Sequence, residues 1–360
     1  MQIFKNVMLR GEITDITVDG GVIKAIGRTD KSGLDCTGLS VYPGLIDTHS
    51  HGVLGLDASD MTCDLETMAT YELEHGITTW YPSTVTIFGD DLEALTNRDL
   101  SNIKGANIPG FHMEGPFINE ALKGAQNGEY CIKASMELFE RCNRKGQVKK
   151  ITVAPECEGA LDFIEKCPAV VSLGHMTADY DTCMEAFKRG ATCLTHTYNC
   201  MPGIHHRKPG PIGAGCDSEG VYAELIADGI HIHPSAIRML VKIFGEDRIV
   251  LISDSVRPTG LGDGEYELGG IMTTVKDGVA RTPEGNLAGS TANLFDCVRK
   301  MIEFGFSPDV AVKMATENPA RLMGLNKGKV AVGYDADLIL VDASFNLKYT
   351  VLGGEVYGKK

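Results

Sequence analysis

The sequence predicts a (β/α)8 barrel that carries a small β domain built from both chain ends. Two observations predict it. In the middle of the chain, short apolar runs alternate with polar loops and helical stretches. They amount to roughly eight β units in about 280 residues, the length expected of such a barrel. At both ends, runs of β-forming residues lie between glycine turns and lack a helical period.

The end segments share one type of pattern. Residues 13–18 and 22–26 are β-type runs near the start of the chain, and residues 337–341 and 348–352 near its end look the same. We expect them to pair into one composite domain of residues 1–46 and 327–360. Residues 47–326 would then form the barrel.

Apolar strands of the barrel are expected to be short. The first candidate strand is the segment just before Asp47. The other seven are residues 76–81, 107–112, 148–154, 169–173, 191–194, 223–227 and 249–252. Hydrophobic periodicity does not report whether a parallel sheet closes on itself, so a doubly wound sheet stays open as an alternative.

Composition argues against several classes of protein. The formal net charge is −14 and no basic run is present, which disfavours nucleic acid and anionic membranes as partners. No window offers about 18 uninterrupted apolar residues, and the first residues do not have the pattern of a signal peptide. The 11 cysteines are an odd number without a C-x-x-C spacing, so we expect reduced thiols in a cytoplasmic protein.

Polar residues follow the predicted strands where a barrel places its chemistry. His49 and His51 stand at i and i+2, so on a strand they project from the same face. Glu114, His175, His196 and Asp254 each come directly after a separate apolar run. Taken singly, each residue has an ordinary explanation as an incidental turn, core or solvated residue. Together they predict a metal centre, because imidazole and carboxylate groups that converge are the ligands of a divalent ion.

The ligand types restrict the metal. Imidazole nitrogens combined with a carboxylate suit Zn²⁺, Fe²⁺, Mn²⁺ or Co²⁺ better than Ca²⁺ or Mg²⁺. We expect one or two such ions, and the sequence does not choose among the four.

Seven motifs occur in a characteristic order along the chain: PGLIDTHSHG at 43–52, HMEGPF at 112–117, SLGHMTAD at 172–179, THTYNCMPGIHHRKPG at 195–210, ADGIHIHP at 227–234, ISDSVRPTG at 252–260 and LAGSTANL at 287–294. With them the chain resembles, nearly end to end, the N-acetylglucosamine-6-phosphate deacetylase family of the amidohydrolase superfamily. The resemblance implies a barrel with a β-sandwich made from both chain ends. It also implies hydrolysis of N-acetyl-D-glucosamine 6-phosphate to glucosamine 6-phosphate and acetate in amino-sugar catabolism.

The resemblance assigns roles to the strand-end residues. It makes Glu114, His175 and His196 the ligands of the principal metal, and it leaves open whether His49 and His51 complete a second metal site. Asp254 resembles the general acid/base of the family. His231 resembles the residue that holds the sugar near the reacting amide.

Substrate contacts are also implied by the resemblance. Asn199 and the backbone N–H of Cys200 would hold the phosphate together with Arg207, which in the family reaches the active site of a neighbouring subunit and so implies a homodimer. The substrate-binding residues further include Ala125, Gln126 and Leu287. Gln126 stands where the family commonly has a histidine. Glutamine can donate a hydrogen bond but cannot carry a positive charge.

Three alternatives remain. One is a deacetylase for a related N-acetylhexosamine 6-phosphate, such as the galactosamine epimer. Another is a different amide hydrolase of the superfamily, such as a dihydroorotase-like enzyme, although the carboxylated lysine of those enzymes has no evident counterpart here. The third is a catalytically silent oligomeric scaffold, which should have lost metal ligands or Asp254, whereas this chain keeps them all.

Overall fold

Eight parallel strands form the central barrel of the computed structural model, which describes residues 1–268 and 270–358. In spatial order the strands are β15 (Ile249–Ile252), β14 (Tyr222–Ile226), β13 (Cys193–Leu194), β12 (Val170–Leu173), β11 (Val148–Val153), β10 (Phe111–Glu114), β9 (Ile77–Thr84) and β6 (Leu45–Ser50). The outer strands β15 and β6 contact each other, and just beyond β15 the N–H of Asp254 donates to the carbonyl of His49 at 2.9 Å. The sheet is therefore nearly closed, which confirms the predicted barrel over a doubly wound sheet.

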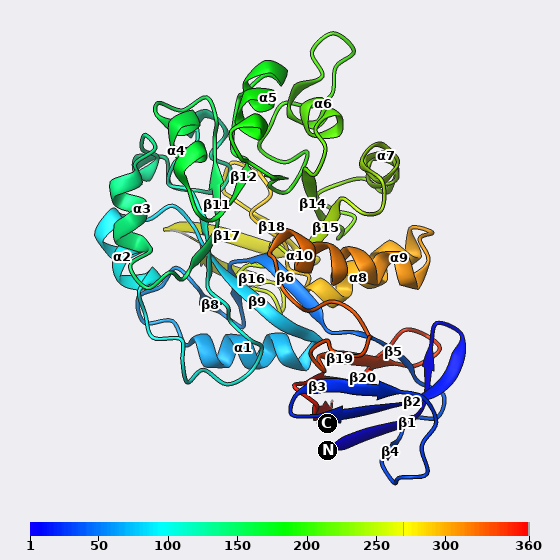
Figure 1. The fold of residues 1–360 in the computed structure, drawn as a ribbon. Helices are drawn as coiled ribbons and strands as arrows, with labels where there is room; N and C mark the ends of the chain where they lie inside the picture. Colours follow the sequence, from blue (N-terminus) through cyan, green and yellow to red (C-terminus); the bar gives the residue numbers. More distant parts are fainter. Residues whose placement is uncertain (269, 359–360) are drawn as a thin grey trace.

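Helices connect the barrel strands and surround them (Figure 1). They are α1 (Leu65–Glu74), α2 (Gly89–Thr96), α3 (Met136–Cys142), α4 (Ala160–Lys166), α5 (Tyr180–Lys188), α6 (Gly210–Asp217), α7 (Pro234–Phe244), α8 (Leu294–Glu303), α9 (Pro308–Met314) and α10 (Glu317–Leu322), with the 3-10 turns η1 (Glu120–Leu122) and η2 (Gly128–Tyr130). Local sequence explains their starts. Asn293, for example, accepts from the N–H of Asp296 and closes a capping box at α8. None of the helices in the described ranges is long and apolar enough to cross a membrane.

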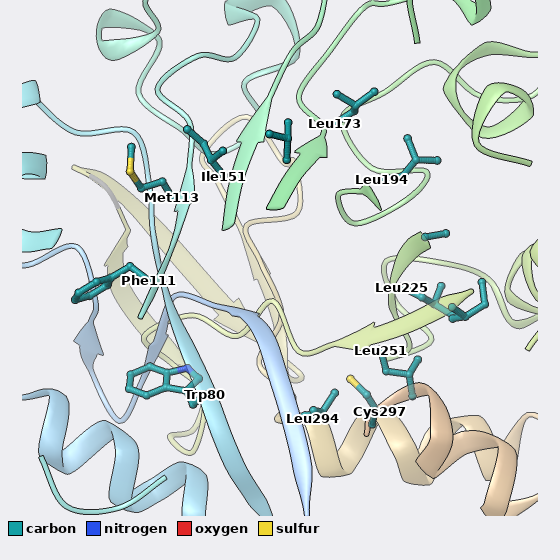
Figure 2. Close-up of a cluster of buried hydrophobic side chains, with 14 of the residues drawn as sticks. Trp80, Phe111, Met113, Ile151, Leu173, Leu194, Leu225, Leu251, Leu294 and Cys297 are labelled. Carbon is teal, nitrogen blue, oxygen red and sulfur yellow. The ribbon is translucent and has the colours of Figure 1, made fainter. Parts of the chain in front are cut away.

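Side chains alternate along each barrel strand, and this alternation separates the core from the site. On β10, Phe111 and Met113 point outward into the apolar layer between strands and helices, where Figure 2 shows them with Ile151 of β11. The residues that alternate with them, His112 and Glu114, are buried on the opposite face. The barrel interior is therefore polar at this level, although each strand reads as mainly apolar.

Two predicted strands are clearly shorter than expected, since β13 covers only Cys193–Leu194 of residues 191–194 and the strand at residues 107–112 starts late. Residues 107–112 were expected to be extended throughout, but β10 begins only at Phe111. Asn107 makes an isolated bridge to Thr79 instead. The physical reason is Pro109, which has no N–H to donate to a neighbouring strand.

The two chain ends build one eight-stranded sheet beside the barrel, shown in blue and red in Figure 1. Its strands are β1 (Gln2–Leu9), β2 (Glu12–Asp19), β3 (Val22–Ile26), β4 (Leu34–Asp35), β5 (Ser40–Pro43), β19 (Leu338–Val341), β20 (Leu347–Leu352) and β21 (Glu355–Gly358). Strand β5 joins the two ends, because it pairs parallel with β1 and antiparallel with β19. Phe4, Ile16 and Leu340 lie in its buried cluster. The domain boundaries at 46/47 and 326/327 stay a prediction.

A smaller antiparallel sheet, which the sequence patterns did not suggest, lies between β15 and α8 in the chain. It consists of β16 (Gly264–Leu268), β17 (Ile271–Lys276) and β18 (Val279–Arg281), and a two-stranded ribbon of β7 (Gly52–Val53) and β8 (Leu56–Asp57) follows the first barrel strand. Leu268 and Val275 of this sheet pack on Val256, two residues beyond Asp254. The small sheet therefore adds a wall beside the carboxyl end of β15.

Candidate metal centre

Three of the predicted ligands meet at the carboxyl ends of β10, β12 and β13. Glu114 is the last residue of β10, and His175 and His196 each stand two residues beyond their strands. All three are 4% exposed. His175 and His196 have positive φ angles of 48° and 27°, and Asp254 has one of 48°. Such strained backbone turns the chain sharply after each strand and aims the side chain into the barrel mouth.

The atoms of this group are spaced as ligands of one ion. The two imidazole Nε2 atoms of His175 and His196 are 3.0 Å apart. Oε1 of Glu114 lies 3.1 Å from Nε2 of His196 and 3.3 Å from Nε2 of His175. Ligands placed at typical zinc distances in a tetrahedron are about 3.3 Å from one another. The donor set therefore fits a divalent transition-metal ion.

Hydrogen bonds on the far side of one imidazole support this fit. Nδ1 of His175 lies 2.9 Å from the carbonyl oxygen of Leu122. Since a carbonyl only accepts, Nδ1 carries the proton and Nε2 presents a free lone pair to the centre. His196 differs, because its Nδ1 is buried and has no hydrogen-bond partner within the described residues.

A second group lies next to the first. Nε2 of His49 is 3.2 Å from Nε2 of His51, and Oδ1 of Asp254 lies 3.6 and 3.4 Å from these two atoms. The Glu114 carboxylate stands between the groups, with Oε1 3.1 Å from His49 Nε2 and Oε2 3.3 Å from His51 Nε2. The geometry therefore offers places for two ions that share Glu114.

Charge in this cluster also favours a bound cation. Burial opposes ionisation of Asp254, but the adjacent His49 and His51 outweigh it and lower the pKa of the carboxyl to about 2. Burial likewise opposes a charge on His51, yet its bonds to Asp254 and Glu114 raise the pKa of the imidazole to about 10. The carboxylates next to His51 thus favour a positive charge at this place, which either a proton or a metal ion can supply. A metal ion fits because two imidazoles and one carboxylate converge there.

Below the ligands lies a buried polar layer that the sequence analysis missed. Lys150 on β11 and Glu224 on β14 form an ion pair inside the barrel, and both are 0% exposed. His112 bonds Ser83 Oγ and Thr152 Oγ1, each at 2.9 Å. Burial and the nearby Lys150 charge hold the pKa of His112 well below its usual value, so this imidazole is neutral. The sequence feature that could have revealed this layer is a charged residue inside a barrel strand, such as Glu224 in the otherwise mainly apolar β14.

Gln126 lies against the centre. Its Oε1 accepts from the backbone N–H of Thr86 at 2.6 Å and from the Thr86 hydroxyl at 3.1 Å. Its amide nitrogen is thereby turned toward Glu114 and donates to Oε2 of that carboxylate. Gln126 thus fixes the orientation of Glu114 as well as lining the cavity.

A cavity of about 710 Å³ opens above the two groups. The predicted contact residues found in its wall are Ala125, Gln126, Asn199, Cys200, His231 and Leu287. Nδ1 of His231 is held by Asp228 Oδ2 at 2.6 Å. Against the effect of burial, Asp228 raises the pKa of His231. A polar small molecule could therefore be held next to the candidate metal ligands.

Arg207 stands apart from this cavity. It lies exposed in the loop of residues 203–208, with Nη1 2.6 Å from Nε2 of His206, and is not among the described residues that line the cavity. Within its own chain, the structure does not bring Arg207 to the site.

Comparison with known proteins identifies relatives of this chain. Residues 40–357 match the amidohydrolase family. An N-acetylglucosamine-6-phosphate deacetylase of Bacillus subtilis (strain 168) is 37% identical over 333 residues, which cover 88% of this chain and 84% of the relative. An N-acetylgalactosamine-6-phosphate deacetylase of Escherichia coli O157:H7 is 34% identical over 354 residues, covering 95% and 94%.

A solved structure agrees in fold over nearly the whole chain. It is a mutant N-acetyl-D-glucosamine-6-phosphate deacetylase from Mycobacterium smegmatis in complex with N-acetyl-D-glucosamine-6-phosphate. The TM-score is 0.92 at 30% sequence identity, and the match covers 99% of this chain and 98% of that one.

Proposed function

Because the chain belongs to the amidohydrolase family and, within it, to the N-acetylhexosamine-6-phosphate deacetylases, we propose that it hydrolyses the N-acetyl group of N-acetyl-D-glucosamine 6-phosphate. The products are glucosamine 6-phosphate and acetate. The resemblance that the sequence motifs indicated is confirmed by these relatives. One observation carries the proposal: two groups of metal-type ligands, one of which includes the Asp254 carboxylate, meet at one cavity.

Glu114, His175 and His196 would hold the principal ion, and His49 and His51 a second one beside Asp254. The ligand types suit Zn²⁺, Fe²⁺, Mn²⁺ or Co²⁺. When bound, such an ion polarises a carbonyl and lowers the pKa of water.

Asp254 is the residue proposed to move protons. It is ionised at neutral pH, because its pKa is about 2 despite burial, so it can accept a proton from the attacking water. It then returns that proton to the nitrogen of the breaking amide bond. This second transfer is needed because an unprotonated amine is a poor leaving group. His231, held by Asp228, would orient the sugar near the amide.

Asn199 and the backbone N–H of Cys200 would hold the phosphate, since both residues line the cavity. The remaining contact would come from Arg207 of the partner subunit in a homodimer. Arg207 is exposed and does not line the cavity of its own chain, which supports a contact with the cavity of a neighbouring subunit. A guanidinium suits the task because it binds two phosphate oxygens at once.

A galactosamine epimer is the second candidate substrate, because one relative is named for it at 34% identity. A dihydroorotase-like reaction that needs a carboxylated lysine is not supported, since the Lys150 ammonium is paired with Glu224. A silent scaffold is not supported either, because both ligand groups and Asp254 are retained. Eleven unpaired cysteines support a cytoplasmic location.

Acetate release from a panel of N-acetylhexosamines, each with and without a 6-phosphate, tests the proposal. The protein should carry an assayed metal content, and Asp254→Asn serves as the control. We expect release from the glucosamine 6-phosphate substrate at the highest kcat/KM. Equal activity on the unphosphorylated sugar would contradict the phosphate contacts, and preference for the galactosamine epimer would select the second candidate.

A further inference from the structure

The buried pair of Lys150 and Glu224 is not used by the proposed reaction. We infer that Glu224, held in place by Lys150, is the positioning residue that makes His49 a metal ligand and thereby decides whether the site takes up a second ion. This inference rests on the proposed metal-dependent function.

One oxygen of Glu224 is fixed from below. Oε1 accepts from Lys150 Nζ and lies 3.4 Å from the hydroxyl of Thr48, and Nζ also donates to the carbonyl of Thr48 at 3.3 Å. Lys150 therefore holds both the carboxylate and the backbone next to His49. Because Lys150 and Glu224 are both 0% exposed, water does not compete for these bonds.

The other oxygen faces the metal ligands. Oε2 lies 3.2 Å from Nδ1 of His49 and 3.3 Å from the backbone nitrogen of His196. A carboxylate only accepts, so Nδ1 of His49 must donate and its Nε2 keeps the lone pair that a metal requires. Glu224 is thus in contact with one residue of each ligand group.

The ring of His49 is also held from the side. The ring of His112 lies edge-on to it with centroids 4.4 Å apart and an interplanar angle of 78°. Both nitrogens of His112 are engaged by Ser83 and Thr152, so His112 restricts rotation of the His49 ring without taking over its hydrogen bond. Glu224 therefore accepts at Nδ1 of His49, while Glu114 stands at Nε2, on the side where an ion would bind.

Glu224→Gln tests this choice. The Lys150 ammonium only donates, so the single carbonyl oxygen of the glutamine will face Lys150, and the amide NH2 will face Nδ1 of His49. His49 must then accept at Nδ1 and carry its proton on Nε2, where it blocks the metal. Loss of such an outer partner typically weakens metal binding by about 10–100-fold. We expect the larger loss for the second ion, because His196 of the principal group loses only a backbone hydrogen bond to Glu224.

The readout is the number and affinity of bound ions, measured by Zn²⁺ titration of metal-free protein and elemental analysis. We expect two ions in the parent and one tight ion in Glu224→Gln. Glu224→Asp keeps the charge but is one methylene shorter, so its second-ion affinity should fall between the two. It also carries the test if the glutamine variant does not fold. Asp15→Asn is the matched control, since it breaks a buried carboxylate–lysine pair in the distant end sheet and should leave both ions bound.

The inference is overturned if either Glu224 variant keeps the parental second-ion affinity, if the Asp15 variant loses an ion equally, or if the parent itself takes up one ion at saturating Zn²⁺. Counting ions requires no substrate. A failure of the proposed deacetylase activity therefore leaves this test intact, and the two outcomes are distinguishable.

Discussion

Oδ1 of Asp254 lies 3.4 Å from Nε2 of His51, although the two residues come from opposite ends of the barrel sequence. The contact depends on barrel closure, because the strands that precede them, β15 and β6, are the two edges of the sheet order. The group proposed to move protons therefore also stands among the candidate ligands of a second ion. Proton transfer by Asp254 and metal binding by Asp254 predict different effects of a mutation at this position.

Asp254→Asn separates these roles. The change keeps the size of the side chain and removes its ability to take a proton, so turnover should fall by roughly 10²–10⁴ while the principal ion and the substrate still bind. Steady-state kinetics with parallel metal analysis measures this. Activity within a few-fold of the parent would mean that another group carries the proton. Loss of the second ion would make Asp254 chiefly a ligand.

The three ligands of the principal site should be equivalent in effect. Removing any one of Glu114, His175 or His196 by alanine should abolish tight metal binding and activity together, because an incomplete donor set no longer holds the ion. His75→Ala is a suitable control, since this histidine bonds the Tyr71 carbonyl at 2.7 Å, at the end of α1. Full metal retention in any of the three variants would refute the assignment.

The convergence of the candidate ligands at the strand ends could be predicted, because their position follows from local sequence. Ile249–Ile252 form a buried strand, and the first carboxylate after it is Asp254. In a parallel barrel the carboxyl ends of all strands meet at one mouth, so residues distant in sequence converge there. No knowledge of which strands are neighbours was required.

The supporting layer could not be predicted in the same way. The alternation along β11 places Lys150 and Thr152 on one face, but it does not say that Lys150 meets Glu224, which lies three strands away in the sheet order. That contact depends on barrel diameter and strand stagger, which single-strand patterns do not encode. The same holds for Gln126, whose bond to Glu114 depends on the loop after β10.

Gln126→Met should weaken metal binding. The methionine has a similar volume but neither accepts from Thr86 nor donates to Glu114, so the carboxylate is no longer fixed. We expect metal affinity to fall by about tenfold or more. Gln147→Met is the control, because Gln147 donates to the carbonyls of Thr96 and Arg98 away from the site. Unchanged affinity in the Gln126 variant would show that Glu114 is held by other contacts.

Acid should destabilise the end sheet through Asp15. Burial opposes ionisation of this carboxyl, but the N–H groups of Asn6 and Thr29 and the Lys5 ammonium lower its pKa from 3.8 to about 2. Because the folded-state pKa lies below the unfolded value, the contribution to stability is full above about pH 4 and is lost as the pH falls toward 2. Thermal unfolding of metal-free parent and Asp15→Asn protein measures it.

The Asp15 variant should be less stable at pH 7 by about 2 kcal/mol, since it loses hydrogen bonds to a charged group. The difference between the two proteins should shrink from pH 4 to pH 2. A difference that stays constant over this range would mean that Asp15 does not titrate as described.

The phosphate contact should affect binding more than chemistry. Arg207 would bind a part of the substrate remote from the breaking bond. Arg207→Ala should therefore raise KM strongly for the 6-phosphate substrate and barely change rates on the unphosphorylated sugar. Lys208→Ala, at the next exposed position of the same loop, is the control for a general loss of positive charge.

Mixed dimers test whether Arg207 acts across the subunit interface. When an Arg207→Ala chain pairs with an inactive Asp254→Asn chain, one site of each heterodimer combines an intact Asp254 with an Arg207 donated by its neighbour. Activity with near-parental KM should return in that site, although neither parent variant shows it. Mass measurement verifies that heterodimers form. If they form and no high-affinity activity appears, Arg207 serves its own subunit and the dimeric site is wrong.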